Sequence, residues 1–180
     1  MPIIGEQPPV DERPAEALKI KATFGDDLLV GDAGNDTISS CKSNDIVSGG
    51  GGNDYIRSEA GNNKITSGSG DDIVRTDAGA DRVDAGAGDD FVFATSDYTL
   101  LDLDVIRDFR GGEDQLLISD DFNIALSGSE RKSTFLTLED GEQNIAGSIQ
   151  VFARDFDLER DVDQMKQADL LALDLFAYVL

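Results

Sequence analysis

Aspartates recur every nine residues along this chain, and they are the residues whose type and spacing are best suited to chemistry. Between residues 22 and 93 the sixth position of each nonapeptide is Asp27, Asp36, Asp45, Asp54, Asn63, Asp72, Asp81 and Asp90. The chain has no histidine, which excludes histidine-based zinc sites and catalytic triads. Carboxylate oxygens without nitrogen or thiolate partners suit Ca²⁺, whereas Mg²⁺ demands a stricter octahedral geometry. The pattern therefore predicts several calcium ions.

Glycines and aliphatic residues keep the same phase as the aspartates. Glycine favours positions 1, 2 and 4, as in GGGGNDYIR over 49–57, and permits tight turns with positive φ. The eighth position is always aliphatic, with Leu29, Ile38, Val47, Ile56, Ile65, Val74, Val83 and Val92. A three-residue strand around it would point only its middle side chain inward. Two repeats then form one coil, and the eight repeats predict an all-β fold, a right-handed parallel β-roll of about four coils.

Stacked coils would bring the carboxylates of repeats n and n+2 close together. Like charges at short range repel strongly in a partly buried setting, and a divalent cation reverses the sign of that interaction. One buried valine-sized side chain contributes about 1.5–3 kcal/mol, whereas ordering each residue of a repeat costs about 1–2 kcal/mol. We therefore expect folding to be coupled to metal binding. A permanently disordered acidic segment is the alternative reading.

The two edges of such a roll differ in sequence. Even-numbered repeats place their turns on one edge, where we expect three good calcium sites. The candidate ligands there are Gly31, Ala33, Asp36, Gly49, Gly50, Gly51, Gly52, Asp54, Ser67, Gly68, Ser69, Gly70, Asp72, Gly86, Gly88 and Asp90. On the odd edge Lys42, Ser43 and Asn63 depart from the pattern. We expect weak or absent calcium there, except around Asp27 and Asp45 and near Asp81.

Composition narrows the partners further. The formal net charge of −22 argues against nucleic acid and anionic membranes. No stretch is long and apolar enough to insert in a membrane. The lone Cys41 excludes a disulfide within the chain and is expected to replace a turn glycine. Glycosidase-type carboxylate pairs are a further possibility, but metal ligation already explains the spacing, so we expect no enzymatic activity from these residues.

Four segments follow from the pattern. Residues 1–21 form a proline-rich lead-in without the features of a secretory signal peptide, and 22–93 form the roll. Residues 94–160 are expected to cap it. Strands are predicted at 91–94, where the period ends, and at 103–109 and 115–118, followed by a hairpin turning at 140–141. Residues 161–180 are expected to include a helix over 162–178.

The repeats and the block after them resemble the hemolysin-type (RTX) calcium-binding C-terminal regions of serralysin-type metalloproteases and of secreted mannuronan epimerases. In that family the repeats lead into Asp-x-Ile-x-Asp-Phe-x-x-Gly-x-Asp, present here as Asp104, Ile106, Asp108, Phe109, Gly112 and Asp114. The resemblance implies that Asp97, Asp104 and Asp114 bind a capping calcium ion; a solvated acidic turn is the alternative. The departure from the family is that no catalytic half precedes the repeats.

The acidic and apolar ending at 174–180, DLFAYVL, is similar to that of type I secretion substrates. The resemblance implies a secreted, extracellular calcium-binding protein that leaves the cell through a type I exporter and folds in external calcium. One alternative is the non-catalytic module of a secreted protease or epimerase. Another is a calcium-dependent adhesin that binds an extracellular polysaccharide through Tyr55, Arg57, Lys64 and Arg75, residues that a solvated strand face explains equally well.

Overall fold

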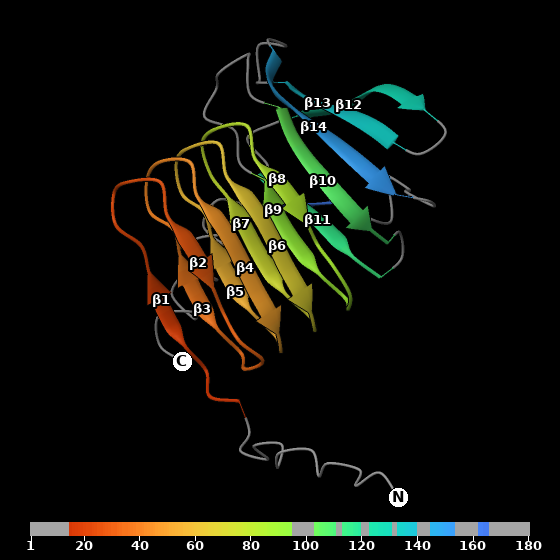
Figure 1. The fold of residues 1–180 in the computed structure, drawn as a ribbon. Coiled ribbons are helices and arrows are strands. Elements are labelled where there is room, and N and C mark those ends of the chain that lie inside the picture. Colours follow the sequence, from red (N-terminus) through yellow and green to blue (C-terminus); the bar gives the residue numbers. More distant parts are fainter. Residues whose placement is uncertain are drawn as a thin grey trace, which may run out of the picture.

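The structure is a computed structural model that describes residues 15–94, 103–110, 113–119, 123–130, 133–139, 145–153 and 162–165. Every regular element in these ranges is a strand, and the strands form two sheets that face each other. Figure 1 shows them stacked as successive coils along one axis. No helix in the described ranges is long and apolar enough to cross a membrane.

Sheet A has seven strands and sheet B has eight. Sheet A contains, in spatial order, β1 (Lys19–Lys21), β3 (Thr37–Ser39), β5 (Tyr55–Arg57), β7 (Ile73–Thr76), β9 (Phe91–Ala94), β11 (Gln115–Ser119) and β15 (Val162–Met165). Sheet B contains β2 (Leu28–Val30), β4 (Ile46–Gly51), β6 (Lys64–Ser69), β8 (Arg82–Asp84), β10 (Leu103–Phe109), β14 (Ile145–Ala153), β13 (Ser133–Glu139) and β12 (Asn123–Glu130).

The repeat strands pair in parallel with a register of eighteen residues, so one coil contains two repeats. Ile38 lies opposite Ile56 in sheet A, and Val47 lies opposite Ile65 in sheet B. Even-numbered repeats supply sheet A and odd-numbered repeats supply sheet B. The prediction of an all-β parallel roll is confirmed.

The core is a double column of the eighth-position side chains. All eight of them are buried, and the most exposed, Leu29, has only 7% of its surface accessible. Their neighbours at positions 7 and 9 lie on the outer faces of the sheets and are partly or fully exposed, except Phe93, which packs against Leu117. Because each nine-residue unit buries one aliphatic side chain, the core is thin and cannot by itself hold the turns in place.

The roll starts one strand earlier than the nonapeptide pattern predicts. Lys19–Lys21 forms β1 and pairs in parallel with β3, so Ile20 lies opposite Ile38. Leu18 stands two residues before Ile20, at the place that aspartate has in the later repeats. The missing carboxylate and glycines hid this half-coil from the sequence pattern.

The expected cap continues the roll before closing it. Strand β10 pairs in parallel with β8, and β11 pairs in parallel with β9. Ile106 lies opposite Val83 and Leu116 opposite Val92, so both extend the buried column. The phase is lost because residues are inserted after 93 and at Asp108, whose φ is +53°. The strands predicted at 91–94, 103–109 and 115–118 are thus confirmed, but as coils of the roll.

The last described strands close sheet B and extend sheet A. The predicted hairpin is confirmed, since β13 and β14 are antiparallel; its turn lies outside the described residues. Strand β12, which the sequence did not predict, pairs with β13. The helix expected over 162–178 is wrong in its first turn, because Val162–Met165 is strand β15 and pairs with β11. The free backbone edge of β11 and the core contact of Val162 favour the strand. Residues 166–178 lie outside the described residues.

Candidate metal centre

The sixth-position residues form a hydrogen-bonded ladder along each edge of the roll. On the even edge, each backbone N–H donates to the carboxylate Oδ1 one coil further on. The donor–acceptor pairs are Leu18 to Asp36 (2.7 Å), Asp36 to Asp54 (2.8 Å), Asp54 to Asp72 (2.8 Å), Asp72 to Asp90 (2.9 Å) and Asp90 to Asp114 (3.1 Å). The structure thus joins the predicted even-edge aspartates in one continuous column.

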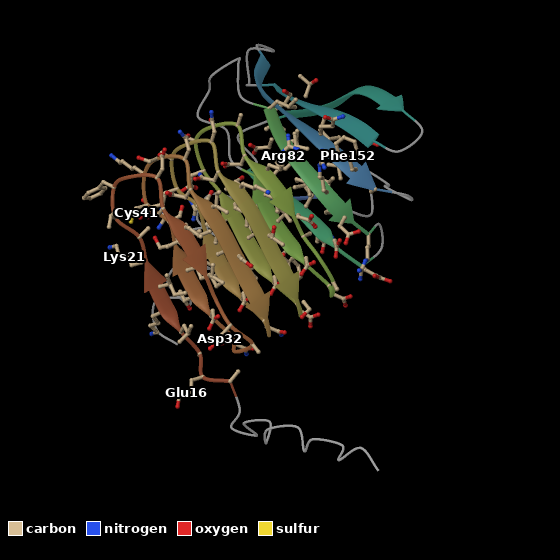
Figure 2. All side chains as sticks on the ribbon, viewed as in Figure 1. Glu16, Lys21, Asp32, Cys41, Arg82 and Phe152 are labelled. Atoms are coloured by element: carbon tan, nitrogen blue, oxygen red, sulfur yellow. The ribbon has the colours of Figure 1, made fainter. Side chains whose placement is uncertain are left out.

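The odd edge carries a second ladder of the same kind. Its pairs are Asp27 to Asp45 (2.8 Å), Asp45 to Asn63 (2.9 Å), Asn63 to Asp81 (2.8 Å) and Asp81 to Asp104 (2.9 Å). In Figure 2, Asp32 and Cys41 mark turns on opposite edges of the roll. The ladders place Asp104 and Asp114 in the sixth positions of the added coil, while Asp97 lies outside the described residues.

The second carboxylate oxygen of the inner aspartates has nothing to bind. The Oδ2 atoms of Asp45, Asp54, Asp72, Asp81 and Asp90 are buried and have no hydrogen-bond partner. Buried polar atoms without a partner are rare in folded proteins, because losing water without replacement is costly. A row of such oxygens is suited to binding cations.

The outermost aspartates differ, because their own turns supply a donor. Oδ2 of Asp36 accepts from the N–H of Asp32 at 2.9 Å, and Oδ2 of Asp114 accepts from the N–H of Arg110 at 2.6 Å. In the inner even repeats the corresponding residues are Gly50, Gly68 and Gly86, and all three have positive φ. Their N–H groups make no bond to Oδ2, so these turns leave the carboxylate open.

Burial makes the inner carboxyl groups hard to ionise without a cation. Burial, chiefly, raises the pKa of Asp54 to about 6, that of Asp90 to about 7 and that of Asp81 to about 8. It also raises the pKa values of Asp72 and Asp114. The neighbouring carboxylates add to the shift, as Asp104 does for Asp81. At neutral pH these carboxyl groups therefore ionise only at a cost that a bound cation would remove.

At the first position of two repeats, Gly31 and Gly49 lack a side chain at points where carboxylate and carbonyl oxygens lie close together. A methyl group on Gly49 would overlap both the carbonyl oxygen of Ser67 and Oδ2 of Asp54. A methyl group on Gly31 would overlap the carbonyl of Gly49 and Oδ2 of Asp36 in the same way. Each gap thus joins a carboxylate of one coil with a carbonyl of the next. Between Ser67 and Ala85 the arrangement changes, because the Ser67 hydroxyl donates to the Ala85 carbonyl.

The donor set fits calcium. In the described ranges no three acidic or thiol side chains come together, so each ion would rest on one or two carboxylates and on backbone carbonyls. That mixture of hard oxygens, in turns that can adjust, is what Ca²⁺ accepts. When bound, the ion supplies the positive charge that the ladders lack. Asp36, Asp54, Asp72 and Asp90, with carbonyls such as those of Gly49 and Ser67, would hold it on the even edge.

The remaining predicted ligands are backbone positions in these turns. Gly52, Gly70 and Gly88 adopt positive φ at the fourth position, where the turns approach closely. Gly51 and Ser69 pair in register in β4 and β6, and Gly51 N–H donates to the Asp32 carbonyl. Ala33 lies in the exposed turn that precedes Asp36.

The odd edge is less simple than the sequence indicated. Cys41 and Ser43 take positive φ at 67° and 102°, where other repeats use glycine, so this turn is strained. The thiol of Cys41 is buried and free. Asp45 nevertheless has an open Oδ2, as has Asp81. The difference in calcium binding between the edges therefore stays a prediction.

A second set of ladder residues, which the sequence did not predict, lies at the fifth position. Here each N–H donates backwards, to the side-chain oxygen one coil earlier. The acceptors are Asp26, Asn35, Asn44, Asn53, Asn62 and Asp71. Their signal was the recurrence of asparagine or aspartate just before the sixth position. These side chains are exposed and mostly neutral, so they hold the turns in register with little added repulsion.

Gly49→Ala should disrupt the gap between Asp54 and Ser67, because the added methyl group occupies the space between the two oxygens. We expect the variant to bind one calcium ion fewer than the unmodified chain, as measured by native mass spectrometry. Gly25→Ala is the matched control, since a methyl group there meets nothing closer than 4.0 Å. An unchanged ion count in Gly49→Ala would contradict this placement.

Comparisons with known proteins agree with the geometry. The family model described as the RTX calcium-binding nonapeptide repeat (4 copies) matches residues 19–40, 42–74 and 66–98. No curated protein matches the chain. Among solved structures it is similar to the AlgE6R3 subunit from the Azotobacter vinelandii mannuronan C5-epimerase, with 19% identity, 82% of this chain and 78% of that chain covered, and a TM-score of 0.29; so slight an overlap carries no functional argument. The coils described above therefore contain RTX calcium-binding nonapeptide repeats.

Proposed function

We propose that this chain is a secreted calcium-binding protein that folds when it meets extracellular Ca²⁺ and that leaves the cell through a type I secretion system. The observation that carries the calcium-driven folding is the row of buried Oδ2 atoms without partners. RTX repeats bind calcium, and in this chain these buried carboxylate oxygens have no hydrogen-bonding partner of their own.

The proposed coupling follows from the balance of charge and core. The chain carries a formal charge of −22, and each inner turn except that of Asn63 buries a carboxyl group with one open oxygen. Without a cation, repulsion between the ladders opposes the small gain from one aliphatic residue per repeat. When calcium binds, attraction between the ions and the carboxylates replaces repulsion between the carboxylates, and each coil can stack on the next. Binding free energy is then folding free energy.

Aspartates of the two edges should contribute unequally to calcium affinity. We expect Asp72→Ala to weaken calcium binding by about tenfold or more, which is ~1.4 kcal/mol, because Asp72 stands between two other charged ladder members. Asp45→Ala should have a much smaller effect, because its neighbour Asn63 is neutral. Far-UV circular dichroism during a calcium titration measures both. Equal effects would refute the asymmetry, and a wild-type chain equally folded in EDTA would refute the coupling itself.

Calcium also gives a physical reason for export in the unfolded state. Extracellular modules bind calcium at about 10⁻⁴–10⁻³ M, far above cytosolic levels. The chain would therefore stay unfolded inside the cell, thread a narrow exporter and fold outside. Folding on the far side would prevent its return.

Residues 174–180 are the proposed export signal. Their deletion should abolish secretion by cells that carry a type I exporter, measured as the protein in the medium against that in the cells. The purified truncated chain should show the same calcium-induced change in circular dichroism as the full chain. Secretion at the normal level would contradict the signal, without affecting the calcium proposal.

We propose no catalytic role for the described residues, because the ladder aspartates are already engaged with one another. The RTX repeats are a calcium-binding structural module. Such a module could also serve as the non-catalytic part of a larger secreted protease or polysaccharide epimerase. A longer gene product that contains this segment would favour that alternative.

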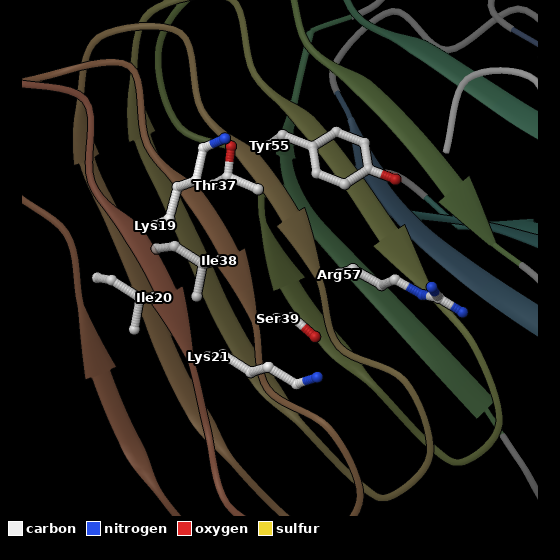
Figure 3. Close-up of a pocket in the computed structure, with 8 residues that line it drawn as sticks. All are labelled: Lys19, Ile20, Lys21, Thr37, Ile38, Ser39, Tyr55 and Arg57. Atoms are coloured by element: carbon white, nitrogen blue, oxygen red, sulfur yellow. The ribbon is translucent and has the colours of Figure 1, made fainter. Parts of the chain in front are cut away.

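A second candidate function is favoured by a basic hollow on the outer face of sheet A. The hollow has a volume of about 190 Å³. Figure 3 shows its lining: Lys19, Ile20, Lys21, Thr37, Ile38, Ser39, Tyr55 and Arg57. Cations, hydroxyl groups and an aromatic ring suit an acidic polysaccharide. Of the residues proposed from the sequence, Tyr55, Arg57 and Arg75 belong to sheet A, but Lys64 belongs to sheet B.

Arg57 is partly neutralised there, since Asp77 lies 3.5 Å from its guanidinium and 3.0 Å from that of Arg75. If the hollow binds an acidic polysaccharide, the calcium-loaded chain should retain uronate-rich glycans on an array and lose them in EDTA. Lys21→Glu should weaken that binding without changing the calcium titration. Retention that is unaffected by this reversal of charge would exclude the hollow as the site.

A further inference from the structure

Asn63 is the one sixth-position residue of the eight repeats that is not an aspartate, and it is fully integrated in the odd ladder. Its backbone N–H donates to Oδ1 of Asp81 at 2.8 Å, and its side-chain Oδ1 accepts from the N–H of Asp45 at 2.9 Å. The residue is buried, with 2% of its surface accessible. Asn63 therefore keeps the geometry of its aspartate neighbours while carrying no charge.

The other end of the Asn63 side chain donates where its neighbours have an open oxygen. The ladder bond fixes the amide orientation, because only the oxygen can accept from the Asp45 N–H. The Nδ2 group then lies 3.1 Å from the carbonyl oxygen of Gly61 and makes a longer, weaker contact of 3.5 Å with that of Ser58. Both carbonyls belong to the turn of the same repeat.

Aspartate and asparagine have nearly the same shape, so Oδ2 of Asp45 and of Asp81 corresponds to Nδ2 of Asn63. Those two oxygens are buried and have no partner. A carboxylate oxygen cannot donate to turn carbonyls, whereas an amide can. One turn is thus satisfied by protein atoms alone, and its neighbours in the same ladder are not.

We propose that the Asn63 amide takes the place of a calcium ion, so that the turn of residues 58–63 is held together without a metal ion. The proposal rests on calcium binding by the other turns. It identifies Asn63 as the residue that lowers the number of ions on the odd edge. It also gives the roll one internal turn whose closure does not depend on external calcium, between coils whose closure does.

The direct test is Asn63→Asp, which restores the open oxygen in an otherwise unchanged turn. We expect this variant to bind one calcium ion more than the wild type by native mass spectrometry. Its thermal midpoint should be below that of the wild type at limiting calcium and should recover at saturating calcium. Asn62→Asp is the matched control, because it adds the same charge at the neighbouring, exposed position and leaves an oxygen to accept from Ala80. It should bind no extra ion.

Asn63→Ala tests whether the Asn63 amide replaces a calcium ion or only accepts the ladder hydrogen bond from Asp45. It removes the amide without supplying a carboxylate, so its midpoint should fall and calcium should not restore it. An ion count for Asn63→Asp equal to that of the wild type overturns the inference and leaves the proposed function standing. The same extra ion in Asn62→Asp, or calcium rescue of Asn63→Ala, also overturns it. A wild type that binds no calcium overturns both proposals.

Discussion

The structure depends on the different roles of the two carboxylate oxygens in each inner aspartate of the ladders. One carboxylate oxygen accepts a backbone N–H from the preceding coil, as Asp54 does from Asp36, and so holds the turns in register. The other oxygen is buried without a partner. The same side chain thus links the coils and creates the need for a cation. Because the aliphatic column adds only one buried residue per repeat, we propose that this electrostatic requirement governs whether the coils stack.

Among the described residues, the ladder carboxylate oxygens without a partner all lie in the interior of the ladders. At the ends, the turns of Asp36 and Asp114 direct a backbone N–H to the second oxygen. In the middle of the odd ladder, the Asn63 amide donates to a turn carbonyl instead. Between the two end turns of the even edge stand turns in which glycine at positive φ leaves the second oxygen without a backbone donor. Small changes of backbone and side chain therefore set which turns leave a carboxylate oxygen without a partner.

Much of this could be read from the sequence because the period is strict. The aliphatic column, the parallel pairing and the strands β9, β10 and β11 were predicted correctly. The limits of the roll were not. Strand β1 lacks the carboxylate signature, and the inserted residue Asp108 interrupts the phase, so the sequence predicts a cap where β10 and β11 form another coil. For strand β15 the sequence predicts a helix, because the pairing with β11 is a long-range contact that a local pattern cannot reveal.

The sequence by itself determined the coil, the core and the carboxylate chemistry of the turns, because each follows from residue types at a fixed short period. Only the tertiary structure decided which oxygen atoms are satisfied and which are open. That depends on the direction of individual N–H groups in the turns, on the exact stacking of one coil upon the next, and on burial that removes water from Asp54, Asp81 and Asp90. These are properties of atoms eighteen or more residues apart, brought together by packing.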